Sequence, residues 1–318
     1  MESNEMEMHE KYLPFTEHQL REHFVEVKQS EESDDTEERH IEYYSKSIQE
    51  YNDYFNNKQV SKSKSFVEMR KPRQIEKDER FWTAACLMTI YHNERHRVKQ
   101  FIQLLSQTYR NVFPLGELNT WEECFKGKLH LFFEPNLPSP KLYKSWLKDN
   151  LRKRQFIPYI LESAVNSKEN LEGPTHVDAM ILNSDNGFAV IIEAKVLSDI
   201  SYQITYDVMR NQIARNIDVM LENNGNLCKT LKSRKPEKTL FLLLTPKCFK
   251  EKENWRSRLY GYKFKEYKNN PESLALDLPH REGVDWQVVS EKLGWLTWED
   301  FKEVNKDCCI WLDEIRGL

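Results

Sequence analysis

Two apolar runs near the middle of the chain carry a pair of carboxylates and a lysine. The first run, Val177–Leu182, contains Asp178, and the second, Phe188–Lys195, contains Glu193 and Lys195. Two carboxylates bind a hard divalent cation, and a cation with an adjacent lysine can activate water at a phosphate ester. This chemistry requires the three side chains to meet, so it depends on the elements that carry them.

The dipeptide Asn186-Gly187 between the two runs predicts a β-hairpin. Side chains alternate along a strand, so Glu193 and Lys195 share one face. A two-residue loop would place Asp178 opposite Lys195, whereas a four-residue loop over 184–187 would place it opposite Glu193. Opposed residues project from the same face, so either loop gathers the three side chains. Two carboxylates on an otherwise apolar face repel each other, and bound Mg²⁺ would make the pair favourable.

The segments around the hairpin predict an α/β core. We expect a basic helix from Lys141 to about Ser167 and another helix from about Ser201 to Glu222. The second helix has the core stripe Met209, Ile213, Ile217 and Met220, with Gln212 and Arg215 beside it. Thr239–Thr245 is a continuous apolar run typical of a strand buried on both faces. The order is therefore helix, strand, strand, helix, strand.

This pattern resembles the PD-(D/E)XK nuclease superfamily over residues 141–250. The matching residues are Glu162 on the first helix, Asp178, Glu193-Ala194-Lys195 at the end of an apolar strand, and Gln212 on the following helix. The resemblance implies a restriction-endonuclease-like α/β (α+β mixed) core, in which a central mixed sheet is flanked by helices. His176-Val177, in place of proline, precedes Asp178 and departs from the pattern.

The resemblance also implies roles for these residues. Asp178 and Glu193 would hold Mg²⁺, or Mn²⁺ in its place, together with Glu162 and the Ala194 carbonyl. Lys195 would orient or deprotonate the attacking water and offset charge on the phosphoryl oxygens. Gln212 would position Lys195 or the phosphate backbone. Taken singly, each residue also has a structural explanation, such as an ion pair between Glu193 and Lys195 at a strand end.

Two basic segments are candidates for nucleic-acid contact. Residues 229–268 hold 13 basic and 4 acidic residues interleaved with aromatic ones, and they include Lys232, Arg234 and Lys235. This composition fits a surface that tracks a phosphate backbone and stacks on bases, although a solvated surface over core aromatics explains it equally. The helix at 141–154 is the second candidate and carries Lys144, Lys148 and Arg152. DNA is the favoured partner, and RNA is left open.

Composition excludes several other functions. With only 9 glycines, the chain contains neither the Rossmann nor the P-loop glycine pattern, and it has no nucleophile elbow. No apolar run approaches the length of a membrane helix, and the acidic start is not a signal peptide. The six scattered cysteines are typical of reduced thiols. We therefore expect a cytoplasmic protein without a membrane partner.

The chain divides, on this interpretation, into three parts. Residues 1–135 form a mainly helical N-terminal region, 141–268 form the nuclease-like core, and 269–318 form a helical extension that packs on the core. The expected function is metal-dependent phosphodiester hydrolysis. The alternatives are an inactive nuclease-like scaffold that serves as a DNA-binding or assembly subunit and, more distantly, a helical scaffold without a nucleic-acid role. A homodimer is left open.

Overall fold

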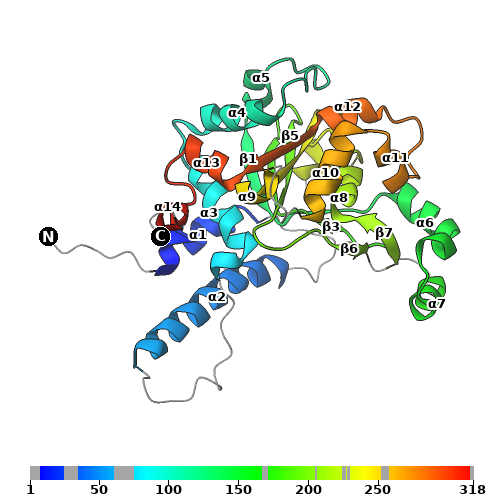
Figure 1. The fold of residues 1–318 in the computed structure, drawn as a ribbon. Helices are drawn as coiled ribbons and strands as arrows, with labels where there is room; N and C mark the ends of the chain where they lie inside the picture. Colours follow the sequence, from blue (N-terminus) through cyan, green and yellow to red (C-terminus); the bar gives the residue numbers. More distant parts are fainter. Residues whose placement is uncertain are drawn as a thin grey trace.

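A five-stranded mixed sheet runs through the centre of the molecule (Figure 1). The computed structural model describes residues 8–24, 35–60, 75–166, 171–204, 206–223, 227, 230–251 and 258–315. The strands lie in the order β1 (Leu129–Phe133), β4 (Ala179–Asn183), β5 (Ala189–Ala194), β8 (Thr239–Thr245) and β9 (Leu293–Thr297). The first three form an antiparallel meander, and β8 and β9 each pair parallel to the strand before them. The expected mixed sheet is confirmed at this level.

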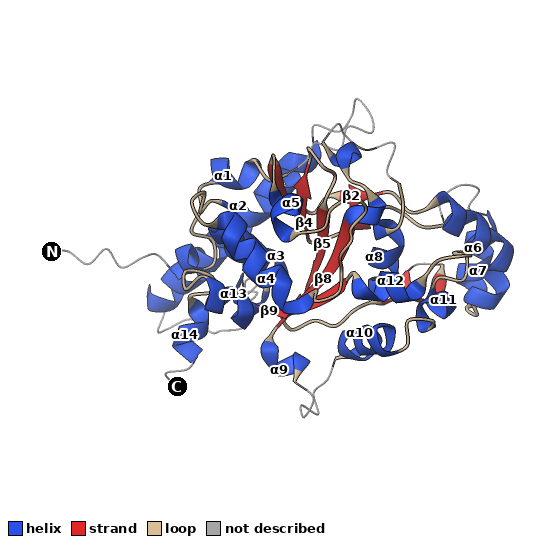
Figure 2. Cartoon of the chain, turned by 90° about the horizontal axis from the view of Figure 1, so that it is seen from above, coloured by secondary structure: helices blue, strands red, loops and turns tan. Residues whose placement is uncertain are grey.

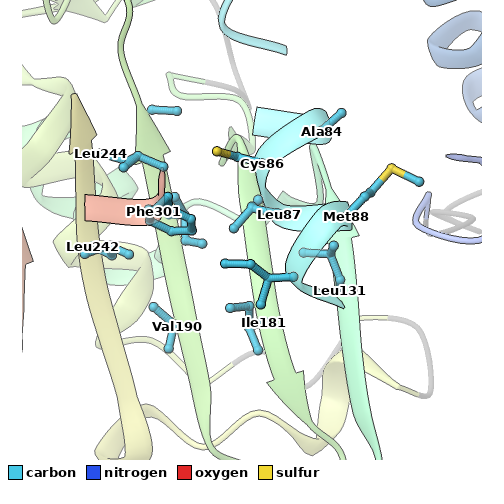
Figure 3. Packing of buried hydrophobic residues seen from close by; sticks show 14 of the residues in the cluster. Ala84, Cys86, Leu87, Met88, Leu131, Ile181, Val190, Leu242, Leu244 and Phe301 are labelled. Atoms are coloured by element: carbon cyan, nitrogen blue, oxygen red, sulfur yellow. The ribbon is translucent and has the colours of Figure 1, made fainter. Parts of the chain in front are cut away.

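Helices cover both faces of this sheet (Figure 2). One face carries α1 (Glu17–Arg21), α2 (Asp35–Val60), α3 (Glu79–Tyr91), α4 (Arg97–Thr108), α13 (Trp298–Val304) and α14 (Trp311–Ile315). The other face carries α8 (Gln212–Met220), α10 (Leu259–Asn269), α11 (Ser273–Asp277) and α12 (Trp286–Glu291). Because side chains alternate, Val190 and Ile192 join the first hydrophobic cluster while Ile191 joins the second. On the first face, Leu87 of α3 and Phe301 of α13 lie over the strands (Figure 3).

The smaller elements lie around this core. They are α5 (Trp121–Phe125), α6 (Lys141–Arg154), α7 (Pro158–Asn166), α9 (Lys247–Lys250), and the two-stranded sheets β2 (Asn136–Leu137) with β3 (Thr175–His176) and β6 (Tyr202–Ile204) with β7 (Asp207–Asn211). Among the described helices, none combines the length and apolar character needed to span a bilayer.

The central hairpin adopts the four-residue loop. Leu182 pairs with Ala189, and the Asn183 amide donates to the Phe188 carbonyl at 2.8 Å. The loop at 184–187 ends at Gly187, whose φ of +81° is a conformation that glycine adopts without strain. Of the two registers allowed by the sequence, the structure therefore has the one that opposes Asp178 to Glu193.

Some helix boundaries differ from expectation. In the mainly helical N-terminal region, α3 and α4 are separated at residues 92–96. The helix expected over 141–167 is interrupted before Pro158, which lacks an amide hydrogen. The helix expected from Ser201 begins only at Gln212, because β6 and β7 occupy its first half and the Asn211 side chain caps α8 by accepting from the Ala214 amide. Met209 consequently lies on β7 and is 52% exposed, so its assignment to the helix core stripe is wrong.

The sheet takes strands from all three parts of the chain. β1 ends the mainly helical N-terminal region and pairs with β4 across all five of its residues. β9, which the sequence did not indicate, belongs to the C-terminal extension and pairs with β8. A capping box starts α13, where the Thr297 side chain accepts from the Asp300 amide. The division near residue 135 therefore falls between two strands that pair in one sheet.

Candidate functional site

Asp178, Glu193 and Lys195 meet at the carboxyl end of β5. The Asp178 Oδ2 accepts a hydrogen bond of 2.7 Å from the Ala194 amide, which fixes this carboxylate against the strand. The Lys195 Nζ lies 2.5 Å from Glu193 Oε1 and also donates to the Ala194 carbonyl at 3.1 Å. Glu193 is fully buried and Lys195 is 4% exposed, whereas Asp178 is half-buried. The structure thus brings the three residues together, as the hairpin geometry predicts.

A third carboxylate, Glu79, approaches the same cluster from the first turn of α3. Its Oε2 lies 3.6 Å from Lys195 Nζ, and its Oε1 accepts from the Val196 amide at 3.3 Å and from the Ser198 hydroxyl. Glu79 follows the N-cap residue Asp78, a position where acidic residues are favoured by the helix dipole. Glu79 was not among the residues predicted from the sequence. The only local signal for Glu79 is the acidic start of its helix.

Negative charge exceeds positive charge in this cluster. Burial raises the pKa of Asp178 well above its ordinary range, and the nearby Glu193 carboxylate raises it further, although Lys195 and the Ala194 amide act in the opposite direction. Burial alone would lower the pKa of Lys195, but the carboxylates of Glu193, Asp178 and Glu79 outweigh burial and raise it. Lys195 is therefore an ammonium at neutral pH, and it faces three carboxyl groups.

The residue of α8 that reaches this cluster is Asn216. Its Nδ2 donates to Glu193 Oε2 at 2.6 Å, so Asn216 and Lys195 together occupy both oxygens of this carboxylate. Gln212 lies one helical turn earlier and is half-buried, and its Oε1 lies 3.5 Å from the Ser201 amide. Gln212 is therefore on the expected helix, but the residue of α8 that contacts Glu193 is Asn216, one turn later.

Glu162 lies outside this cluster. It is exposed on α7, in the helical pair at the edge of the molecule, and makes no contact with Asp178, Glu193 or Lys195 in the described structure (Figure 1). The reason is topological: the helix that approaches the end of β5 is α3, which precedes β1. The metal-ligand role expected of Glu162 is therefore not supported by its position.

A buried ion network fixes the elements next to the cluster. Arg210 on β7 is fully buried and contacts Glu172 at 3.0 Å and Asp218 of α8 at 2.7 Å. Arg215 reaches Glu172 at 3.3 Å and donates to the carbonyls of Gly173 and Pro174. Because Glu172 precedes β3 and Asp178, this network ties the segment that carries Asp178 to the helix that carries Asn216.

The cluster offers oxygen ligands that suit a hard cation. Within the described ranges, no group of three or more His, Cys, Asp or Glu side chains is arranged closely enough to hold a metal. In this conformation Lys195 and Asn216 occupy the oxygens of Glu193, Lys195 also donates to the Ala194 carbonyl, and the Ala194 amide donates to Asp178. Carboxylate and carbonyl oxygens are nevertheless the type of ligand that Mg²⁺ and Mn²⁺ take.

The expected nucleic-acid contacts divide into exposed and buried residues. Lys148 and Arg152 are exposed on α6 and Lys144 is half-buried there. Lys232 and Lys235 are exposed and line a pocket of about 500 Å³ beside the hairpin loop, which is at the end of β5 opposite to Glu193.

Arg234 is not available for the phosphate contact expected of it. It is 2% exposed, and its guanidinium donates to the carbonyls of Met220, Val219 and Glu222 at the C-terminal end of α8. The aromatic residues near it are also mainly core: Phe249, Tyr260, Phe264 and Tyr267 are buried, and only Tyr262 is exposed among the described ones. Trp255 lies outside the described residues.

Comparison of the chain with models of known protein families, with curated proteins and with solved structures found no match.

Proposed function

We propose that this protein is a metal-dependent nuclease that hydrolyses phosphodiester bonds, with DNA as the favoured substrate. The observation that carries the proposal is the convergence of Asp178, Glu193 and Lys195 at one strand end, with Glu79 and Asn216 reaching them from two helices. A purely structural ion pair would need one carboxylate for the lysine. Three carboxylates around one lysine leave negative charge that a divalent cation would balance.

The fold supports the same assignment. The chain passes from α3 and α4 through the antiparallel meander of β1, β4 and β5, crosses through α8, and returns in β8 parallel to β5. We take this arrangement as a restriction-endonuclease-like core. On that assignment the core begins near Glu79, so it includes part of the region before residue 135.

The chain's residues would divide the work as follows. Asp178, Glu193 and the Ala194 carbonyl would hold Mg²⁺ or Mn²⁺, with Glu79 as an additional carboxylate. The metal, when bound, would polarise the scissile phosphate and lower the pKa of a water molecule. Lys195, released from Glu193, would orient the attacking water and stabilise charge on the phosphoryl oxygens. Asn216 would hold Glu193 in place.

A second candidate is a nuclease-like scaffold without turnover that binds nucleic acid or serves assembly. The observation that favours it is the complete burial of Glu193, whose two oxygens are already occupied by Lys195 and Asn216. This arrangement is that of a satisfied structural ion pair, and it would need to open before Glu193 could ligate a metal. The scaffold would bind nucleic acid without any requirement for a divalent cation.

A cleavage assay separates the two candidates. Linear, circular and single-stranded DNA, together with RNA, are incubated with Mg²⁺, Mn²⁺ or EDTA. The nuclease predicts cation-dependent cleavage that Asp178→Asn and Glu193→Gln abolish. The matched control is Asp185→Asn, because Asp185 is an exposed carboxylate at the other end of the same hairpin. Equal cleavage by the parent and both site variants would refute the assignment, and binding without cleavage would favour the scaffold.

A further inference from the structure

The turn between α6 and α7 presents large apolar side chains to solvent. Phe156 is 79% exposed and Tyr159 is 80% exposed, although both are aromatic residues of a type that normally buries much of its surface. Ile157 between them is 40% exposed, and Val165 further along α7 is 63% exposed. We call Phe156, Ile157 and Tyr159 the α6–α7 platform. Contiguous exposed apolar groups of this kind indicate an interaction surface.

Positive charge adjoins the α6–α7 platform. Lys148, Arg152 and Lys153 are exposed in the last turns of α6, and none of them forms an ion pair with another residue in the described ranges. Lys144, Lys148 and Arg152 follow each other at four-residue steps, so they form a stripe along one side of the helix that leads to Phe156. An acidic partner with flat apolar groups would complement this combination.

The platform is held on a rigid base. Leu147 and Leu151 of α6 pack with Ala164 of α7 in a separate small hydrophobic cluster. Arg154, in the last turn of α6, is buried and pairs with Asp207 of β7 at 2.9 Å. The exposed aromatic rings therefore stand on fixed backbone, which lowers the conformational entropy lost when a ligand stacks on them.

We infer that the α6–α7 platform binds an unpaired stretch of nucleic acid, with bases stacked on Phe156 and Tyr159 and phosphates bound by Lys148, Arg152 and Lys153. Aromatic side chains stack on the faces of unpaired bases, and a basic groove beside them tracks the backbone. A duplex keeps its base faces covered by neighbouring pairs, so it would use only the basic stripe. This inference rests on the proposed function, because it names the substrate class as single-stranded or partly unpaired nucleic acid.

The platform is also connected to the candidate site. Leu171 packs in the same small cluster as α6 and α7, and the chain continues from it through Glu172 and β3 to Asp178. Arg215 and Arg210 hold Glu172 against β7 and α8. The segment that carries Asp178 is therefore packed at its start against the helices that form the base of the platform.

Binding of labelled DNA in EDTA tests the platform independently of catalysis. Fluorescence anisotropy is measured with a short single strand and with the duplex of the same sequence, using the full chain, Phe156→Ala/Tyr159→Ala and Leu276→Ala. Leu276 is the matched control, because it is a large apolar residue 75% exposed on α11, outside both basic segments. We expect the double variant to bind the single strand about 10- to 100-fold more weakly, with little change for the duplex or for Leu276→Ala. Sedimentation of the free proteins accompanies the measurement.

The outcomes are distinguishable. Unchanged single-strand affinity in the double variant, or an equal loss in Leu276→Ala, would overturn the inference. An equal loss for the duplex would overturn the preference for unpaired bases. A self-associating parent that the double variant renders monomeric would show that the platform contacts a second copy instead. If Asp178→Asn and the parent show equal cleavage but the platform variant loses single-strand binding, the proposed nuclease site fails and the binding site remains.

Discussion

The substitution Asp178→Asn should stabilise the metal-free protein while it abolishes cleavage. Asparagine keeps the shape of the side chain, and its Oδ1 can still accept the hydrogen bond that the Ala194 amide now donates to Asp178 at 2.7 Å. The change removes one of the three carboxylates whose charges act on Lys195, while the two that lie within 4 Å of its Nζ, those of Glu193 and Glu79, remain. In the folded protein, burial and the charge of Glu193 raise the pKa of Asp178, so its ionised form is unfavourable there.

The magnitude follows from the strand register. Asp178 lies opposite Glu193, and opposed strand residues have Cβ atoms about 5 Å apart. Two unit charges at about 5 Å repel by roughly 3 kcal/mol at an effective dielectric constant near 20, and the Lys195 ammonium offsets part of this. We therefore expect the free energy of unfolding to rise by about 1–3 kcal/mol, which in a chain of 318 residues corresponds to a Tm increase of roughly 1.5–4.5 °C.

The pH dependence gives the sign of the effect. A carboxyl group whose pKa is raised in the folded state favours folding while it is protonated, and this contribution is lost as the pH rises through the folded-state pKa. The stability difference between Asp178→Asn and the parent should therefore be small in acid and should grow toward neutral pH. Glu193 and Lys195 remain in place in both proteins, so the difference isolates Asp178.

The assay is thermal unfolding with and without Mg²⁺. The parent should gain stability when Mg²⁺ is added, because a ligand that binds only the folded state shifts the unfolding equilibrium, whereas Asp178→Asn should gain much less. Asp185→Asn, in the exposed loop of the same hairpin, should behave like the parent. A lower Tm for Asp178→Asn without metal would refute the charge argument, and equal Mg²⁺ responses would refute the role of Asp178 as a ligand.

Four further predictions concern single contacts. Lys195→Met should destabilise the protein by about 3–5 kcal/mol in urea unfolding, because it leaves Glu193 buried and unpaired, and adding Glu193→Gln should recover most of the loss. Asn216→Ala should weaken Mg²⁺ affinity by about 10- to 100-fold in calorimetry, and equal affinity would show that its bond to Glu193 is not needed for the metal. Arg234→Met should lower stability by about 3 kcal/mol without changing DNA affinity at low temperature, because its guanidinium satisfies carbonyls of α8. Burial lowers the pKa of His23 to about 4, so stability should fall by about 2–3 kcal/mol as the pH drops from about 6.5 to 4, and a His23→Gln variant with the same slope would contradict this.

The hairpin of the candidate site could be predicted because its information is local. Asn186-Gly187, two apolar runs and strand alternation are sufficient to bring Asp178, Glu193 and Lys195 together. The loop length remained open, because both registers keep the three residues on one face. In the structure the loop has four residues and ends at Gly187, whose φ is +81°. The buried strand Thr239–Thr245 was predicted to the residue, because it is apolar on both faces.

The partners of this hairpin could not be predicted, because they come from distant parts of the chain. Glu79 lies 114 residues before Glu193 in the sequence. Nothing near Glu79 in the sequence indicates that the first turn of α3 packs against the end of β5. Asn216 was missed because the apolar pattern before it suggested one long helix, whereas β6 and β7 occupy residues 202–211. Arg234 looked like a surface cation because a basic segment gives no sign of which member is buried beneath a helix end.

Charge balance differs between the two buried ion clusters of this protein. Asp218 on α8 is buried like the carboxylate cluster, and burial by itself would raise its pKa. The hydrogen bond from His280 and the charges of Arg210 and Arg281 nevertheless hold that pKa well below its ordinary value. Asp178, on the same side of the sheet, has its pKa raised by burial and then by the charge of Glu193, which together outweigh Lys195 and the Ala194 amide. A fold that can supply several cations to one aspartate could have paired Asp178 in the same way. The cation that we propose for the end of β5 would supply the missing positive charge there, and the Mg²⁺ response of Asp178→Asn tests this explanation.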